Sequence, residues 1–308
     1  MSPPETTGDT LAATIDDLAE WFATYVYTRT PHAYIVLALW VVHTHTIEMV
    51  STTPRIQVTS PQPGCGKTTL MEHLHRLVMN SEMGSHATPP LICRIVNIQQ
   101  TTLLLDETDN LMNPKKEGVG DLTALLNAGY RKGQPQARLV QKSKNDANTD
   151  GDGWAVVRHK TYAAVALAGI GHHLPEALTS RCIQIELDRA REGQVTETDW
   201  DECEIAAWAL RDRIAAHADA ITDDFSKPKP EVPGLHGRPR EVWMPLLQLA
   251  NIAGPDTYTK ALAAYEHLTG VEEVAAGLRP KRQEEQILID LQQVYDQAEK
   301  PSGDTFIT

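Results

Sequence analysis

The segment Ser60–Thr69, with the sequence SPQPGCGKTT, constrains the fold of this chain more than any other. A short apolar run at 56–59 precedes it, and leucines at helical spacing follow it. Backbone N–H groups in a glycine-containing turn between a strand and a helix bind the phosphates of a nucleotide. We predict that Lys67 contacts the β- and γ-phosphates and that Thr68 binds Mg²⁺. The residues predicted to contact the nucleotide are Pro63, Gly64, Cys65, Gly66, Lys67, Thr68 and Thr69.

A pair of acidic residues forms a second motif further along the chain. The apolar run Thr102–Leu105 predicts a buried strand, and Asp106 and Glu107 follow it at once. Ligands of α/β proteins bind at the carboxyl ends of parallel strands, so this pair should lie beside the phosphate loop. We predict that Asp106 holds Mg²⁺ and that Glu107 orients or deprotonates the attacking water. Asp109 is interpreted only as a helix-start residue.

Composition and charge exclude several classes of protein. The net charge of −13 over 308 residues argues against a protein that coats nucleic acid with its whole surface, although a local basic path remains possible. The four cysteines form no close pairs, which argues against a zinc ribbon or a disulfide framework. The histidine pairs have no third ligand nearby, so no metal centre is expected there. The longest apolar stretch, 33–42, is far shorter than the roughly 20 residues of a membrane helix. We predict a cytoplasmic protein without a membrane segment.

Short apolar runs alternate with amphipathic stretches, which predicts an α/β fold with a parallel five-stranded sheet. The predicted strands lie near 55–60, 84–88, 102–106, 162–168 and 182–187. The predicted helices lie near 10–28, 31–50, 67–80, 90–97, 118–129, 175–180, 198–220, 239–253, 256–268 and 281–298. The predicted domains are an N-terminal helical segment (1–52), a nucleotide-binding core (53–190), a helical lid (191–300) and a tail (301–308) that resembles the start of a truncated domain.

The segment Leu174–Leu187 contains the spacing Leu-Pro-x-x-x-x-Ser-Arg-Cys. Together with the Pro-Gly-x-Gly-Lys-Thr form of residues 63–68, it resembles the AAA+ ATPases and, in this spacing, their clamp loaders. The resemblance implies that Arg181 reaches across a subunit interface to the γ-phosphate bound by a neighbour. The alternative is a surface arginine before an edge strand. Pro61, which stands where the loop motif usually has its first glycine, is a minor departure from the AAA+ form.

Two other positions are interpreted through the same resemblance. Gly169 occupies the place of the polar sensor that ends the fourth strand in these ATPases, so another group must position the water or hydrolysis is slow. The run 237–241 (GRPRE) resembles the second sensor at the start of a lid helix. Arg240 fits the general spacing and would assist catalysis, whereas Arg238 is the alternative and would bind the nucleotide.

A closer resemblance covers about residues 15 to 300. It rests on several motifs in a fixed order: Leu39–His45, Thr53–Arg55, Leu104–Glu107, Asn127–Arg131, Ala168–Pro175 and Trp243–Leu247. These residues resemble the replication-associated ATPase domain of actinobacterial phages and mobile elements, which is often joined to primase-polymerase or helicase modules. The resemblance implies a role in DNA replication.

The stretch 131–160 differs in charge from the rest of the chain, with seven Lys and Arg against three Asp. Two β-prone runs at 137–141 and 154–158, separated by Asn, Asp and Gly, predict a hairpin. Its position before the fourth strand resembles the pore-facing insertion of AAA+ helicases, whose basic side chains contact phosphates without reading sequence. The alternative is a solvated hairpin whose charges keep an edge strand soluble. The predicted DNA contacts are Arg138, Lys142, Lys144 and Arg158.

These patterns favour an ATP- and Mg²⁺-dependent motor in DNA replication, a helicase or translocase. It would form a ring of identical subunits, with a hexamer expected, and bind single-stranded DNA without sequence preference. A replicative helicase or primase is a further expected partner. One alternative is a helicase loader or clamp-loader-like switch that acts on a protein. A third interpretation is an ATP-gated assembly scaffold.

Overall fold

The structure, a computed structural model of the chain, describes residues 9–84, 88–141, 154–171 and 174–270. The chain divides into two compact units, residues 1–264 and 265–308, and the description below concerns the first. The predicted helix at 281–298 and the tail at 301–308 lie outside the described residues, as do Lys142 and Lys144. The predicted domain boundaries at 52 and 190 lie inside the first unit and stay a prediction.

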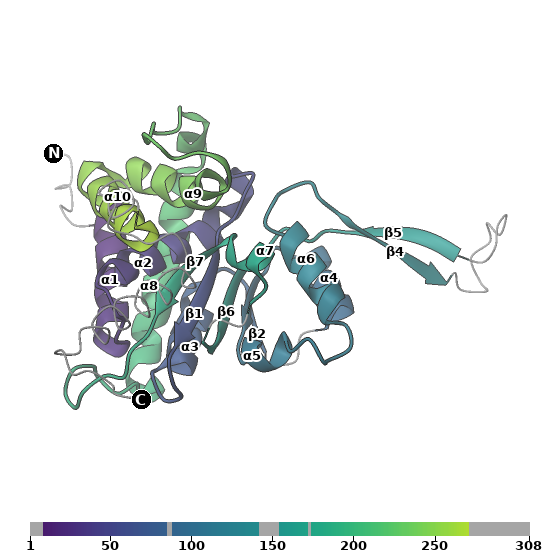
Figure 1. Cartoon of the computed structure of the whole chain (residues 1–308). Coiled ribbons are helices and arrows are strands. Elements are labelled where there is room, and N and C mark those ends of the chain that lie inside the picture. The colour runs from purple at the N-terminus through teal and green to yellow at the C-terminus, as the bar shows by residue number, and fades with distance from the viewer. Residues whose placement is uncertain (1–8, 85–87, 142–153, 172–173, 271–308) are drawn as a thin grey trace, which may run out of the picture. The chain divides into compact units, whose positions relative to one another are not determined.

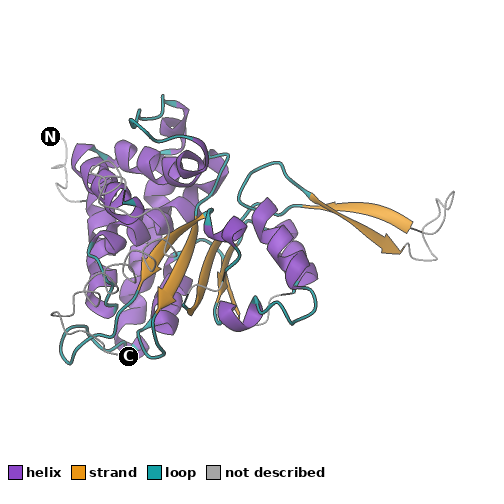
Figure 2. Cartoon of the chain, viewed as in Figure 1, coloured by secondary structure: helices purple, strands orange, loops and turns teal. Residues whose placement is uncertain are grey.

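Five parallel strands form the central sheet, in the order β2-β3-β6-β1-β7 (Figures 1 and 2). Their bounds are β1 (Arg55–Ser60), β2 (Ser81–Gly84), β3 (Thr102–Leu105), β6 (Ala164–Ile170) and β7 (Cys182–Glu186). β1 and β3 are buried along their whole length, because helices cover both faces of a parallel sheet. This arrangement confirms the predicted α/β fold with a parallel five-stranded sheet. β2 begins three residues before its predicted range. The prediction was inaccurate because the residues of β2 alternate in exposure at the sheet edge, so no apolar run marks the strand.

The helices of the sheet layers begin within one residue of their predicted starts, except α5, whose range was not among the predicted helices. They are α3 (Lys67–Leu77), α4 (Pro89–Ile98), α5 (Thr108–Leu111), α6 (Val119–Ala128) and α7 (Glu176–Thr179). The remaining helices are α1 (Leu11–Tyr25), α2 (His32–Thr46), α8 (Trp200–Ala220), α9 (Gly237–Ala253) and α10 (Pro255–Thr269), with short 3₁₀ turns at Ile47–Met49 and Thr222–Ser226. α2 is apolar all round and packs against α1, α8 and α9, which explains its burial. Among the helices described, none is long and apolar enough to cross a membrane.

A two-stranded hairpin lies outside the parallel sheet, as predicted. It consists of β4 (Gln136–Gln141) and β5 (Trp154–His159), paired antiparallel from Gln136 opposite His159 to Gln141 opposite Trp154. Figure 1 shows the two strands extending away from the helices α4 and α6. Arg158 is exposed on β5, and Arg138 lies on β4.

Gly129, at the end of α6, allows the two chain segments at the base of the hairpin to approach closely. A Cβ atom there would collide with the carbonyl oxygen of Thr161. We expect Gly129→Ala to lower the free energy of unfolding by about 2–3 kcal/mol, because backbone atoms would have to move. Urea denaturation measures this change. Gly120→Ala on the same helix is the matched control, since a Cβ there meets nothing and alanine favours a helix. Equal stability of the two variants would contradict the prediction.

His43 on α2 is fully buried, and its Nε2 lies 2.8 Å from Thr53 Oγ1. Burial lowers the pKa of His43 to about 3, so the folded chain keeps this ring neutral where the unfolded chain protonates it. The stability that depends on a neutral His43 is therefore fully present above the ordinary histidine pKa of 6.5. It is lost progressively as the pH falls toward 3. We expect the free energy of unfolding to fall by roughly 1 kcal/mol per pH unit below 6.5 from this residue. Denaturation at pH 7 and pH 5 tests this, and His43→Gln should reduce the difference between the two pH values.

Candidate nucleotide-binding site

The phosphate loop joins β1 to α3 at the carboxyl edge of the sheet. Gly64 and Gly66 have φ angles of 77° and 85°, which glycine adopts without strain, and α3 begins at Lys67. The Lys67 ammonium donates a hydrogen bond of 2.6 Å to Ser60 Oγ, which holds the side chain along the loop. The loop therefore has the predicted strand–turn–helix context, with its cation beside the turn.

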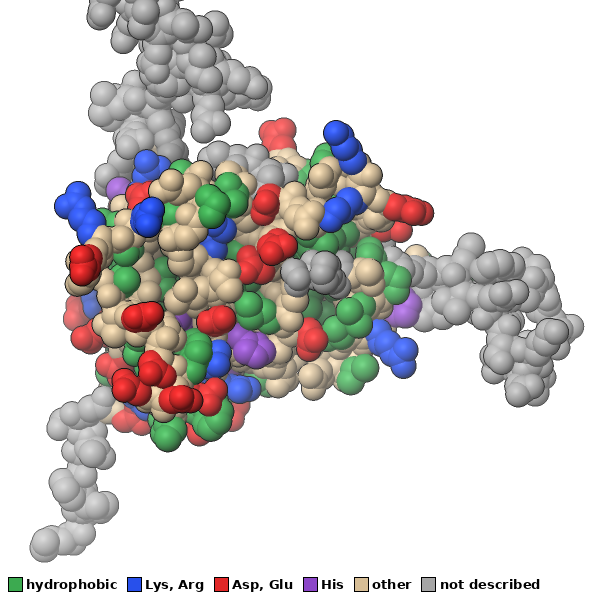
Figure 3. Space-filling model, turned by 90° about the horizontal axis from the view of Figure 1, so that it is seen from below, with side chains coloured by type: hydrophobic (Ala, Val, Ile, Leu, Met, Phe, Trp, Pro, Cys, Tyr) green, Lys and Arg blue, Asp and Glu red, His purple; other side chains and the backbone are tan. Residues whose placement is uncertain are grey.

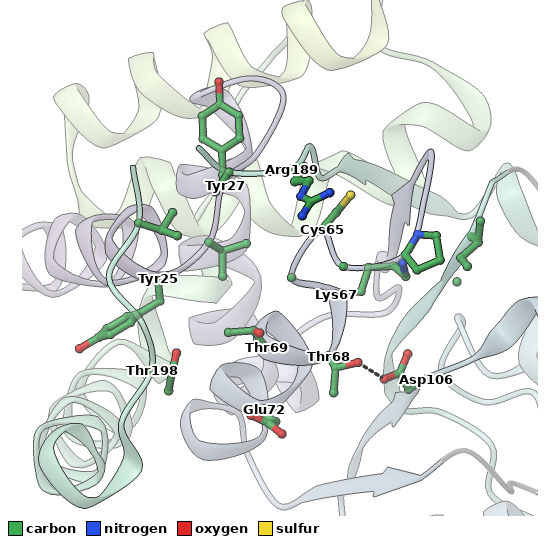
Figure 4. A pocket seen from close by; sticks show the side chains of 18 of the residues that line it. Tyr25, Tyr27, Cys65, Lys67, Thr68, Thr69, Glu72, Asp106, Arg189 and Thr198 are labelled. Atoms are coloured by element: carbon green, nitrogen blue, oxygen red, sulfur yellow. Dashed lines mark hydrogen bonds between the residues drawn. The ribbon is translucent and has the colours of Figure 1, made fainter. Parts of the chain in front are cut away.

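The acidic pair lies beside this loop, as predicted. Thr68 Oγ1 donates a 3.0 Å hydrogen bond to Asp106 Oδ2, drawn in Figure 4. The other oxygen of Asp106 accepts a 2.8 Å bond from the backbone N–H of Glu107. Glu107 has a left-handed backbone with φ of 53°, a conformation that costs a non-glycine residue about 1–3 kcal/mol and is typical of functional sites. A hydroxyl and a carboxylate in contact are the oxygen ligands that Mg²⁺ prefers, so the pair fits the predicted cation site.

A cavity of about 930 Å³ surrounds these groups. All seven predicted loop residues line it, as do Asp106 and Glu107. A volume of this size suits a nucleotide-sized ligand. Other lining residues were not predicted, because they belong to segments without a motif: Tyr25, Val26 and Tyr27 at the end of α1, Arg189 and Ala190 after β7, Val195 to Thr198, and Trp200. Figure 4 shows Tyr25 on the opposite side of the cavity from Asp106, and no motif in the sequence marks Tyr25 or Tyr27.

His73, on α3, packs against two residues that line the cavity, Tyr25 and Trp200. Its ring stacks on Tyr25 at 4.6 Å and lies at 4.6 Å from the ring of Trp200. Burial, and then the nearby Arg76, lower the pKa of His73 to about 4. The ring is therefore neutral at pH 7, and its Nδ1 accepts the 3.0 Å bond from Trp21 Nε1. Nε2 must then carry the proton and donate to Thr198 Oγ1, also at 3.0 Å.

The helix α5 packs against β6, the strand on which Gly169 occupies the position of the missing sensor. Gly169 lines the cavity, and no side chain extends from it. Asp109 and Asn110 line the same cavity, and Asp109 Oδ1 accepts a 3.3 Å bond from the N–H of Ile170. Lys116 Nζ donates a 2.7 Å bond to Asn110 Oδ1. Asp109 thus joins α5 to β6 in addition to starting the helix, which goes beyond the predicted role.

Arg181 lies at the opposite edge of the sheet from the phosphate loop. It immediately precedes β7, whose first residue Cys182 pairs with Arg55 at the start of β1. The phosphate loop follows the other end of β1, and a six-residue strand spans about 20 Å. Arg181 therefore cannot reach a phosphate bound by its own loop.

The two candidate second-sensor residues lie away from the cavity of their own chain, and their action on a nucleotide stays a prediction. Arg238 donates hydrogen bonds to the hydroxyl of Tyr130 and, at 2.5 Å, to Glu241. Arg240 is exposed, and neither residue lines the cavity. The arginine that does line the cavity is Arg189 (Figure 4).

Comparisons with known proteins place the chain only coarsely. Residues 187–305 match a family described as "Protein of unknown function (DUF3631)". No curated protein matches the chain. Solved structures of JCV helicase, with and without a bound inhibitor, are similar at 12% identity and TM-scores of 0.34–0.35. They cover 84–86% of this chain, and the chain spans about three fifths of their length (61–62%).

Proposed function

We propose that this chain is the subunit of an ATP-hydrolysing ring that works as a helicase or DNA translocase in the replication of a phage or mobile element. The separation of two groups of residues carries the proposal. The phosphate loop and the acidic pair lie at the carboxyl edge of the sheet, and Arg181 lies at the amino edge. A site that uses both groups is complete only when the carboxyl edge of one subunit meets the amino edge of the next.

The proposal gives a role to each of the main predicted residues. Lys67 and the loop N–H groups bind the triphosphate, and Thr68 and Asp106 hold Mg²⁺. The cation, when bound, offsets negative charge on the phosphates. Glu107 accepts a proton from the attacking water, and Asn110 orients that water in place of the sensor absent at Gly169. Arg181 of the next subunit stabilises the charge that develops on the γ-phosphate.

The hairpin β4–β5 is the proposed DNA contact. The face shown in Figure 3 carries acidic side chains spread among hydrophobic ones, in keeping with the net charge of −13. The hairpin stretch has an excess of positive charge instead. Hairpins repeated around a ring would line a basic channel for single-stranded DNA.

Removal of one of these charges should weaken DNA binding in a salt-dependent way. We expect Arg158→Ala to lower the affinity for a homopolymeric single strand and to reduce the slope of log K against log salt by about 0.7, because one phosphate contact is lost. A fluorescence-anisotropy titration at several salt concentrations measures this slope. Lys229→Ala removes an exposed charge from the connector before α9 and is the control. An unchanged slope for Arg158→Ala would favour the solvated-hairpin alternative.

Two measurements test the proposal as a whole. Native mass with a non-hydrolysable ATP analogue should show a ring, and phosphate release should increase when single-stranded DNA is added. A monomer under every condition would refute the shared site. A ring that hydrolyses ATP without response to DNA, but captures a replicative helicase, would instead identify the loader. The glycine at position 169 favours that second candidate, because a site without the usual sensor suits a slow switch.

A further inference from the structure

We propose that Arg238 acts on the nucleotide of the neighbouring subunit, beside Arg181, and not on the nucleotide of its own chain. The proposal rests on the proposed shared site and adds a second trans-acting residue to it. It also assigns Glu241 as the internal counter-ion that positions this arginine before the neighbour binds.

Arg181 and Arg238 are held on the same aromatic ring. The guanidinium carbon of Arg181 lies 4.8 Å from the centre of the Tyr130 ring, and that of Arg238 lies 4.7 Å from it. Arg131 lies near the same ring, at 5.6 Å. Three residues from separate parts of the sequence, at the ends of α6, α7 and the start of α9, are therefore gathered at one point of the amino edge.

The charges at this point are unbalanced. Arg131 and Arg238 share a single carboxylate, that of Glu241, which also accepts a 3.2 Å hydrogen bond from the Tyr130 hydroxyl. Burial, and then repulsion from the nearby Arg238, lower the pKa of Arg181. Arg55 is buried nearby, 1% exposed, and adds a fourth positive charge.

Several donors of this cluster lack an acceptor. Within the described part of the chain, Nε of Arg181 and both Nε and Nη1 of Arg55 have no hydrogen-bond partner. A buried donor without a partner costs about 1–3 kcal/mol, and more when it is charged. The side chains of Arg131 and Arg238 remain 41% and 34% exposed, so the cluster is open to an approaching ligand. Four cations beside one carboxylate, with Arg131 and Arg238 accessible, indicate a site for an anion as highly charged as a terminal phosphate.

The cavity of the same chain has no need of Arg238. Arg189 already lines it, and the first turn of α9 contributes no residue to its wall. Arg238 is separated from it by the length of β1, like Arg181, because both contact Tyr130. Arg238 is therefore placed to contact a phosphate bound by the neighbouring subunit, and not a phosphate bound by the loop of its own chain.

Rings assembled from two different variants distinguish action of Arg238 on the neighbour's nucleotide from action on the nucleotide of its own chain. Subunits with Lys67→Ala cannot use their own loop but still offer a complete amino edge, and subunits with Arg181→Ala have the opposite defect. Each alone should be inactive, and the mixture should regain ATPase activity at junctions where the two intact halves meet. Failure of this first step would refute the shared site itself, independently of Arg238.

Arg238→Ala is then added to one partner at a time. On the Lys67→Ala subunit we expect at least a tenfold loss of the regained activity. This subunit supplies the amino edge of every active junction, and the substitution removes Arg238 from that edge. On the Arg181→Ala subunit we expect no further loss, since that edge is already disabled and residues that act as a unit are not additive. The opposite pattern would overturn the proposal, as would equal losses on both subunits. Arg94→Ala, which removes an exposed arginine on α4, controls for general loss of charge.

Glu241 is tested as a positioning residue in the same mixture. With Glu241→Gln on the Lys67→Ala subunit, Arg238 loses its counter-ion, and we expect a lower kcat with an unchanged KM for ATP. Arg94→Ala on that subunit should not reproduce this change. If Arg240→Ala, and not Arg238→Ala, abolishes the regained activity, the trans role belongs to Arg240 and the assignment of Arg238 is wrong.

Discussion

Replacing Glu107 with glutamine is expected to lower the rate of ATP hydrolysis by about 10²–10⁴-fold while leaving nucleotide binding close to wild type. The amide keeps the size of the side chain but cannot accept a proton from water. The left-handed backbone of Glu107 and the hydrogen bond from its N–H to Asp106 do not depend on the carboxylate, so the site should keep its shape. Steady-state phosphate release measures the rate, and titration with a fluorescent ATP analogue measures binding.

A matched variant shows whether the effect belongs to the site. Asp121→Asn neutralises an exposed acid at the start of α6, outside the cavity, and should retain wild-type turnover. Loss of nucleotide binding in Glu107→Gln would assign this residue to the phosphates or the cation. Full activity would transfer the role of base to another group in the cavity, with Asp109 the first candidate.

Arg181→Ala is expected to lower ATP turnover by about 10³–10⁵-fold, the loss that follows removal of an arginine from phosphoryl-transfer sites. Affinity for ATP in the isolated subunit should not change, because Arg181 lies about 20 Å from the phosphate loop of its own chain. The same separation predicts that wild-type activity per subunit rises with protein concentration. Turnover measured across a dilution series checks both statements.

Two outcomes would contradict the prediction for Arg181→Ala. Activity that is independent of concentration would show that one subunit suffices, and Arg181 would then be the surface arginine of the alternative interpretation. A loss of ATP affinity in Arg181→Ala monomers would indicate damage to the fold instead. Native mass of the variant with an ATP analogue separates a catalytic defect from a failure to assemble.

The sequence predicted the parts of the site that local geometry determines. Gly64, Gly66 and Lys67 follow a buried strand and open a helix, so their neighbours in sequence are sufficient to place them. Asp106 was predictable for the same reason, since parallel strands bring their ends to one edge.

Contacts between distant segments were not predictable in this way. Tyr25 reaches the cavity because α1 ends there, and Arg189 because the chain passes over the loop after β7. Neither residue belongs to a pattern of spacing. The distance of Arg238 from the cavity was not predictable, because the position of Arg238 depends on how α9 packs near Tyr130, which no local signal encodes. The edge strand β2 was misplaced because half of its residues face solvent.

The base of the hairpin is fixed to the arginine cluster. Tyr130 and Arg131 belong to the short connection between α6 and β4, and an isolated β-bridge joins Arg131 to Thr52 before β1. The close approach of Gly129 to Thr161 fastens the other side of this base. In the proposed ring, a phosphate that draws Arg181 and Arg238 from the Tyr130 ring would pull on the base of the hairpin, whose strands are each about 20 Å long. The hairpin would act as a lever, so that a small movement where one subunit senses its neighbour's ATP becomes a larger movement at the far ends of the two strands, at Gln141 and Trp154.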